Sequence, residues 1–343
     1  MKEQDSKGLS EREHLVLMTT IEDYIEVNHP VGSNFLKKRH LFSFSPATIR
    51  NTLACLESKG MLTHTHTSSG RIPTDEGYRY YVDQLSGSEK MEGKLDEDTF
   101  KNLIQMTLNI DDLMQATATL LSKVSRLFGF VMISEVNKSI LTDIELISLS
   151  SDRVMVVLAM KTGLIRSIVL ELKVVVNQNE LDSITAILKE CLLGLSLDEI
   201  QKTIHLRVCG SDVFDHEIIQ VLINEPASHF SLAGNTLIYT SSYSELLNYP
   251  EFQEVTILQK TIKALEKRNI KQFIKSNVGS KKKYTFIGHE TNNDLMDHFS
   301  ILTSRFSSDL VTGQLAVLGP TRIRYQFVKR ILEDFSKVLP NVC

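Results

Sequence analysis

The stretch that decides the fold is residues 66–81, HTSSGRIPTDEGYRYY. It contains a Ser/Gly turn, then Arg71, then Pro73 and Thr74. Proline has no N–H to donate, so it ends strand pairing. Threonine is a favoured helix N-cap, and the two acidic residues that follow it suit the positive end of a helix dipole. The stretch therefore predicts a β-turn between two short strands, followed directly by a helix.

Two helices are predicted near the start of the chain. Ser10 and Glu13 have the spacing of a capping box at the start of the first helix, and Pro30 follows its end. The second helix is predicted from residue 33 to 40, with Ser33 as its N-cap.

A third helix is the best marked in the chain. Ser45 is its predicted N-cap, and proline follows at the favoured first position. Ile49, Leu53 and Leu56 recur at i, i+4 and i+7, so we expect them to face the core. Gly60 fits a C-terminal cap. Helices joined by a turn and followed by an arginine-tipped hairpin are typical of a winged-helix DNA reader.

The opposite face of the third helix has an unusual composition. It carries Ala47, Asn51, Ala54 and Ser58, flanked by Thr48 and Arg50. Small side chains let a helix approach the groove floor, Asn can contact adenine, Thr and Ala can touch a thymine methyl, and Arg can reach guanine or phosphate. An ordinary solvent-facing helix, the alternative, is expected to carry more Glu and Lys. We therefore expect Thr48, Arg50 and Asn51 to read bases or fix the register.

The distribution of charged residues also favours a DNA-binding surface in this region. The net charge of the chain is -4, but a nucleic-acid reader needs only a local basic surface. Between residues 33 and 71 the basic side chains are Lys37, Lys38, Arg39, Arg50, Lys59 and Arg71, and the acidic one is Glu57. A chance fluctuation on a solvated face is the alternative. The candidates for phosphate contacts are Ser33, Lys37 and Lys38, and those for the turn region are His66, Ser68, Ser69 and Arg71. Ser45, at the start of the third helix, is a further candidate for DNA contact.

Metal and catalytic sites are not expected. His64 and His66 share a face of the predicted strand, but two histidines without a nearby third ligand make an incomplete zinc site. The sequence has no phosphate-binding glycine loop and no motif around a Ser/His/Asp or Cys/His set. We therefore expect neither an enzyme nor a bound cofactor.

Composition indicates a cytoplasmic protein of several domains. The chain has 343 residues, 42% of them hydrophobic, which suits two or three packed domains. No run approaches the roughly 18 apolar residues of a membrane helix, and the charged N-terminus lacks a signal peptide's apolar core. The four cysteines are scattered without a CxxC pair, as expected in a reducing cytosol.

Beyond the third helix and hairpin, the pattern predicts a mixed α/β domain with a helical insertion. The predicted segments are a polar linker at 87–94, a helical stretch at 96–128, β-type hairpins between 130 and 172, a mainly helical region at 180–265, β-type runs between 284 and 319, and a closing helix at 322–339.

Several motifs resemble the bacterial heat-inducible transcription repressor family, HrcA. They are residues 45–51, SPATIRN; 56–60, LESKG; 66–79, HTSSGRIPTDEGYR; 286–290, FIGHE; and 319–325, GPTRIRY. The chain departs from the family's usual form at Thr52 and Leu53, where an acidic or polar residue and Met are usual, and at Ser69, where Ala is common. The resemblance covers nearly the whole chain, more weakly between residues 177 and 265.

The resemblance implies an α+β multidomain fold. Its expected parts are a winged helix-turn-helix domain at 1–86, a linker at 87–94, a GAF-like domain at 95–177 and 276–343, and a mainly helical dimerising insertion at 178–275.

The resemblance also implies a function. It implies a homodimeric repressor that binds an inverted-repeat operator, the CIRCE element upstream of chaperone operons, and that the chaperonin GroEL keeps active. Occupying an operator blocks polymerase and needs no catalysis. The alternative is a ligand-gated regulator whose GAF-like domain binds a small molecule, since such domains often do.

Overall fold

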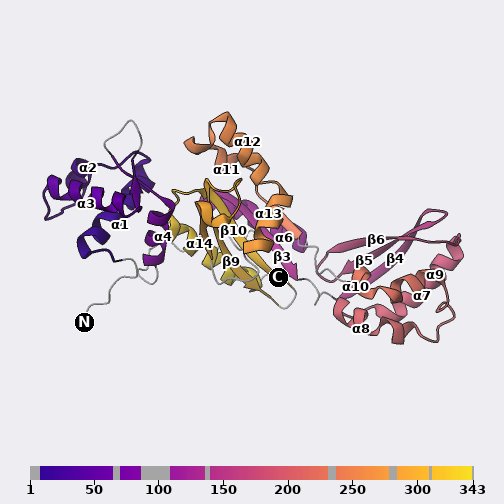
Figure 1. Cartoon of the computed structure of the whole chain (residues 1–343). Helices are drawn as coiled ribbons and strands as arrows, with labels where there is room; N and C mark the ends of the chain where they lie inside the picture. Colours follow the sequence, from indigo (N-terminus) through magenta and orange to yellow (C-terminus); the bar gives the residue numbers. More distant parts are fainter. Residues whose placement is uncertain are drawn as a thin grey trace.

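Three units follow one another in space along the chain (Figure 1). The computed structural model describes residues 8–64, 70–85, 109–135, 140–230, 237–277, 284–308 and 311–341. Helices and several separate sheets occur together, as the α+β expectation requires. The predicted linker at 87–94 lies outside the described residues.

The N-terminal unit, residues 8–85, consists of helices and a small hairpin. Its elements are α1 (Glu11–Val27), α2 (Ser33–Arg39), α3 (Pro46–Ser58), β1 (Leu62–Thr63), β2 (Ile72–Pro73) and α4 (Asp75–Gln84). The capping box of Ser10 and Glu13, and the cap of α4 by Thr74, are both confirmed. The N-cap of α2 is wrong by one residue: Gly32 occupies it, and Ser33 is the buried first residue of the helix.

The hairpin of this unit is anchored to the segment between α1 and α2. Val31 and Arg71 exchange two backbone hydrogen bonds of 2.8 Å, which adds a third strand-like segment beside β2. Gly70 approaches the Pro30 backbone so closely that an added Cβ would lie 2.6 Å from the Pro30 carbonyl carbon. This close approach explains why glycine precedes the arginine of the turn.

The central unit is built on a five-stranded antiparallel sheet of order β7-β3-β10-β9-β8. Its elements are α6 (Ile110–Ser125), β3 (Phe128–Glu135), β7 (Leu237–Thr240), α11 (Ser244–Leu247), η1 (Pro250–Phe252), α12 (Val255–Ala264), α13 (Lys267–Asn277), β8 (Thr285–Ile287), η2 (Gly288–Thr291), β9 (Phe299–Ser307), β10 (Thr312–Pro320), α14 (Tyr325–Val338) and η3 (Leu339–Asn341).

Alternate side chains of this sheet enter two separate cores. On β3, Val131 and Ile133 belong to the cluster that includes α6 and α14. Phe128 and Phe130 belong to a second, phenylalanine-rich cluster with residues of α12 and α13. This is the period-2 alternation expected of a strand covered on both faces.

The distal unit, residues 140–230, has its own three-stranded sheet of order β4-β5-β6. Its elements are β4 (Leu141–Ser150), β5 (Arg153–Met160), β6 (Ile165–Glu171), α7 (Gln178–Leu192), α8 (Leu197–Val208), α9 (Glu217–Asn224) and α10 (Pro226–Phe230). The predicted antiparallel hairpins and the mainly helical region after them are confirmed.

Strand pairing groups these elements differently from the domain boundaries proposed from the sequence. The boundary at 177 and 178 separates β4–β6 from α7, yet β4 packs on α7. Residues 237–240, expected in the insertion, form β7 and pair with β3 in the central sheet. The reason is that β4–β6 bury one face against the distal helices and share no pairing with the central sheet.

Gly70→Ala is expected to destabilise the N-terminal unit. The new Cβ would press on the Pro30 backbone, so the free energy of unfolding should fall by about 1–3 kcal/mol, the usual cost of overpacking. The control is Gly32→Ala, where a Cβ meets nothing within 4 Å, with an expected loss below about 1 kcal/mol. Urea unfolding followed by circular dichroism measures both; equal effects would contradict the close-approach argument.

Candidate nucleic-acid interface

Helix α3 presents one buried and one exposed face. Ser45 caps it, since its hydroxyl oxygen accepts a hydrogen bond of 3.1 Å from the Thr48 N–H, and Pro46 takes the first position. Ile49, Leu53 and Leu56 are buried, as predicted. The residues of the opposite face, Ala47, Asn51, Ala54 and Ser58, are exposed. The predicted division of the helix is thus confirmed.

The three candidate reading residues of α3 differ in accessibility. Arg50 and Asn51 are exposed. Thr48 is half-buried, and its hydroxyl lies 3.0 Å from the Ser45 hydroxyl. Thr52, which departs from the family's usual residue, is buried and donates to the Thr48 carbonyl, so it does not belong to the exposed face.

The candidate phosphate contacts of α2 are also unequal. Lys38 is exposed to solvent. Lys37 is half-buried, and its ammonium donates to the Phe42 carbonyl, which ties the end of α2 to the turn before α3. Ser33 is buried, with an exposed fraction of 7%. Of the three, Lys38 is the most available to an external anion.

At the base of the hairpin, Arg71 lies against α3. Its Nε is 2.8 Å from a carboxylate oxygen of Glu57, and both side chains are mostly covered. The hydrogen bond with His64, and then the Arg71 guanidinium, hold the pKa of Glu57 below its usual range. The hairpin base is therefore fixed to the C-terminal half of α3. The candidates His66, Ser68 and Ser69 lie outside the described residues.

An ion pair with the buried acid Glu13 fixes the same, C-terminal, end of α3 to α1. Lys59, directly after α3, lies 2.8 Å from Glu13 of α1, and the Cys55 thiol donates to the same carboxylate at 3.0 Å. The hydrogen bond from Lys59, followed by that from Cys55, lowers the pKa of Glu13 to about 2. The sequence argument assigned Glu13 only to the capping box and missed this contact, because it joins segments 46 positions apart.

His64 is paired with Glu57, and the described residues contain no group of three or more His, Cys, Asp or Glu side chains able to hold a metal ion. No described helix is long and apolar enough to cross a membrane.

Comparison with known proteins decides the family. A family model described as "HrcA protein C terminal domain" matches residues 111–328. A heat-inducible transcription repressor HrcA of Chlorobium phaeobacteroides is 31% identical over 345 residues, covering 97% of this chain and 98% of that protein. The chain belongs to the HrcA family. Proteins of the same description from Halalkalibacterium halodurans and Geobacter sulfurreducens are each 30% identical and cover 97% of this chain, with 97% and 98% of their own lengths matched.

A solved structure supports the fold over the same length. It is described as "Crystal structure of a hypothetical protein at 2.2 A resolution", and it matches with a TM-score of 0.63 and 20% identity. The match covers 97% of this chain and 98% of that one. The N-terminal unit with α3 lies outside the HrcA family model but inside these full-length matches.

Replacing Glu13 with Gln tests the anchor of α3. Gln retains the capping box but removes the charge that pairs with Lys59. Because the folded-state pKa, about 2, is below the ordinary 4.5, the charge stabilises the fold above about pH 4.5 and this stabilisation is lost as the pH falls toward 2. The variant should therefore melt below the wild type at pH 7, with a gap that narrows between pH 4.5 and 2. Glu11→Gln, an exposed neighbour on α1, is the control, and a gap independent of pH would contradict the pairing.

Proposed function

We propose that this chain is a heat-inducible transcription repressor that binds DNA through its N-terminal unit, a winged helix-turn-helix. The observation that carries the proposal is the exposed, small and mostly uncharged face of α3, held out from the core by buried apolar residues on its other side. The full-length similarity to proteins named heat-inducible transcription repressor HrcA supports it.

In this proposal α3 enters the major groove. Asn51 and Arg50 are exposed, and their side chains can form hydrogen bonds with base edges. Thr48 is a neighbouring residue of the same helix. Lys38 at the end of α2 supplies a phosphate contact, which carries affinity rather than sequence information. Arg71 acts at the hairpin base, where its pairing with Glu57 holds that base against α3.

We infer that two copies bind an inverted-repeat operator, because a two-fold dimer matches a two-fold DNA site. The distal sheet offers a self-association surface. Ile147, Met155 and Val169 are directly opposite one another on β4, β5 and β6 and therefore share one face. Ile147 and Val169 are 44% and 48% exposed, although they are large apolar side chains on a packed sheet. A two-fold partner would cover such a face.

The further parts of the proposal follow from family resemblance. The central unit is assigned as GAF-like, the operator as CIRCE-type, and the partner that keeps the repressor active as the chaperonin GroEL. Heat diverts the chaperonin, so active repressor falls and chaperone genes are expressed. Repression consists of occupying the operator and needs no catalytic residue. A small-molecule sensor is the less favoured function, since the full-length relatives are named for heat induction.

Asn51→Ala is expected to reduce sequence discrimination. The loss of a bidentate contact to one base should weaken binding to the inverted repeat by about 10- to 100-fold, equivalent to roughly 1–3 kcal/mol, and leave a scrambled duplex nearly unchanged. Lys38→Ala is the contrasting variant: it should weaken both duplexes alike and lower the salt dependence by about one unit. Fluorescence anisotropy over a salt series measures both. Equal affinity of the wild type for the two duplexes would contradict the repressor proposal.

Val169→Asp is expected to disrupt self-association. A carboxylate on the outward face of the distal sheet would have to be buried without a partner, which costs several kcal/mol. Sedimentation velocity should show the wild type as a dimer and the variant as a monomer. Val255→Asp on α12, where valine is 65% exposed, is the matched control and should remain dimeric. A dimeric Val169→Asp variant would place the interface elsewhere.

A further inference from the structure

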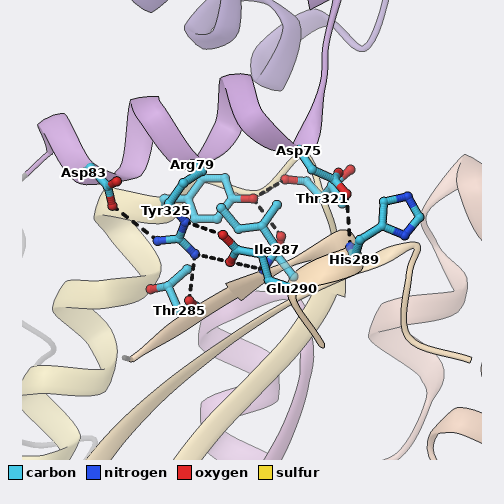
Figure 2. Close-up of polar contacts among 10 residues, drawn as sticks. Asp75, Arg79, Asp83, Thr285, Ile287, His289, Glu290, Thr321 and Tyr325 are labelled. Atoms are coloured by element: carbon cyan, nitrogen blue, oxygen red, sulfur yellow. Dashed lines mark hydrogen bonds and ion pairs between the residues drawn. The ribbon is translucent and has the colours of Figure 1, made fainter. Parts of the chain in front are cut away.

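Figure 2 shows a polar junction between α4 of the N-terminal unit and the central unit. The Arg79 guanidinium donates to both carboxylate oxygens of Glu290, with Nε 2.7 Å from Oε1. It also donates to the Thr285 carbonyl at 2.8 Å and lies 3.3 Å from Asp83 one turn along α4. Glu290 is itself oriented by the Ile287 N–H at 3.1 Å. Because the planar guanidinium of Arg79 is bound to both carboxylate oxygens of Glu290, the pair fixes the relative orientation of the two groups as well as their distance.

A second contact docks the first turn of α4. The Asp75 carboxylate accepts a hydrogen bond of 3.0 Å from the His289 N–H (Figure 2). Gly288 has φ +50 and lies so close that an added Cβ would be 2.0 Å from an Asp75 oxygen. The turn at η2 is thus shaped to receive this carboxylate, and only glycine fits both its backbone angle and the space.

Aromatic packing completes the junction. The Tyr325 ring at the start of α14 lies 5.9 Å from the Tyr78 ring and 6.3 Å from the Tyr81 ring, measured between centroids. Tyr78 and Tyr325 are each 2% exposed. The Tyr325 hydroxyl donates to the Thr321 carbonyl and is 2.7 Å from the Ser300 hydroxyl, which fixes the ring's position. This aromatic packing holds α4 against the central unit, and the contact of the Arg79 guanidinium with two carboxylate oxygens sets the orientation of α4.

The orientation of α4 is linked to that of α3 through contacts with α1. On its other side, the Tyr80 hydroxyl is 2.9 Å from His14 Nδ1 of α1. Helix α1 in turn holds α3 through the Glu13–Lys59 pair. A chain of direct contacts therefore runs from the central unit through α4 and α1 to α3. If the Arg79 fork opened, α4 could turn about its aromatic contacts and α3 would turn with it.

We propose that Arg79 and Glu290 form a positioning pair that sets the separation and angle of the two α3 helices in the dimer. The pair would thereby make binding selective for the spacing between operator half-sites. This rests on the proposed function. One additional base pair shifts a half-site by about 3.4 Å and rotates it by about 34°. A reading unit docked at a fixed angle cannot follow such a change, whereas one on loose contacts can.

The test measures binding of the full-length dimer to a series of inverted repeats whose spacer is shortened or lengthened by up to two base pairs, and to a duplex with one half-site. The variants are Arg79→Gln, Glu290→Gln and the double substitution. The wild type should prefer one spacer strongly. Each variant should reduce that preference by at least about tenfold, and the double variant no more than either alone, because both remove one contact. Affinity for the single half-site should remain unchanged.

Arg79→Lys separates orientation from charge. It keeps the positive charge but loses the two-pronged fork, so it should behave as Arg79→Gln does on the spacer series. Lys202→Gln is the control, since it removes an exposed ion pair with Asp198 on α8 far from the junction and should leave spacer preference intact.

Three other results would contradict the positioning role, and the third would contradict the proposed function as well. A spacer preference unchanged by Arg79→Gln would overturn the positioning role. Equal loss of affinity for every duplex, the single half-site included, would assign Arg79 to folding support alone and overturn it as well. Equal binding of the wild type to inverted-repeat and scrambled duplexes would instead defeat the proposed function, and the positioning role with it.

Discussion

The burial of one face of α3 is the constraint on which the N-terminal unit depends. Ile49, Leu53 and Leu56 are covered by α1, α2 and the hairpin, while the opposite face of the helix is exposed. Two ion pairs hold α3 in this position. Lys59 is bound to Glu13 of α1, and Glu57 is bound to Arg71 of the hairpin. These ion pairs use charges near the C-terminal end of α3, and Arg50 and Asn51 in the N-terminal half remain exposed.

Features with local signals were predicted well from the sequence. Ser45, Pro46 and Gly60 mark the ends of α3 because caps depend on residues within one turn. The one error in this region, Ser33 in place of Gly32 as the cap of α2, arose because serine and glycine are both accepted at that position and differ by little free energy. The division of α3 into two faces followed from periodicity alone.

Features that depend on long-range contact were not predicted. Arg79 and Glu290 were both visible in recognisable motifs, but 211 positions separate them and no local pattern pairs them. An arginine among three tyrosines, in the run YRYY at 78–81, was the available signal. The grouping of β4–β6 with α7 was missed for a similar reason: an antiparallel hairpin has the same alternation whichever sheet it joins. The contact of Lys37 with the Phe42 carbonyl was also missed, although it spans only five positions, because it depends on how the chain turns after α2.

The distal unit is inserted between two neighbouring strands of the central sheet. The chain leaves the sheet after β3 and returns as β7, and Ile133 and Leu237 are direct partners across those two strands. Departure and return are therefore neighbours, and β3 also pairs with β10, with one register irregularity between Thr312 and Gly313. The distal unit is thus a branch whose two chain connections are neighbours, and its β5–β6 turn also contacts the start of α6 through a hydrogen bond of 3.2 Å from the Ile110 N–H to the Thr162 carbonyl. A unit inserted between neighbouring strands in this way can diverge in sequence or lengthen with little effect on the pairing of the central sheet, and the contacts of α4 with that sheet's unit do not involve it.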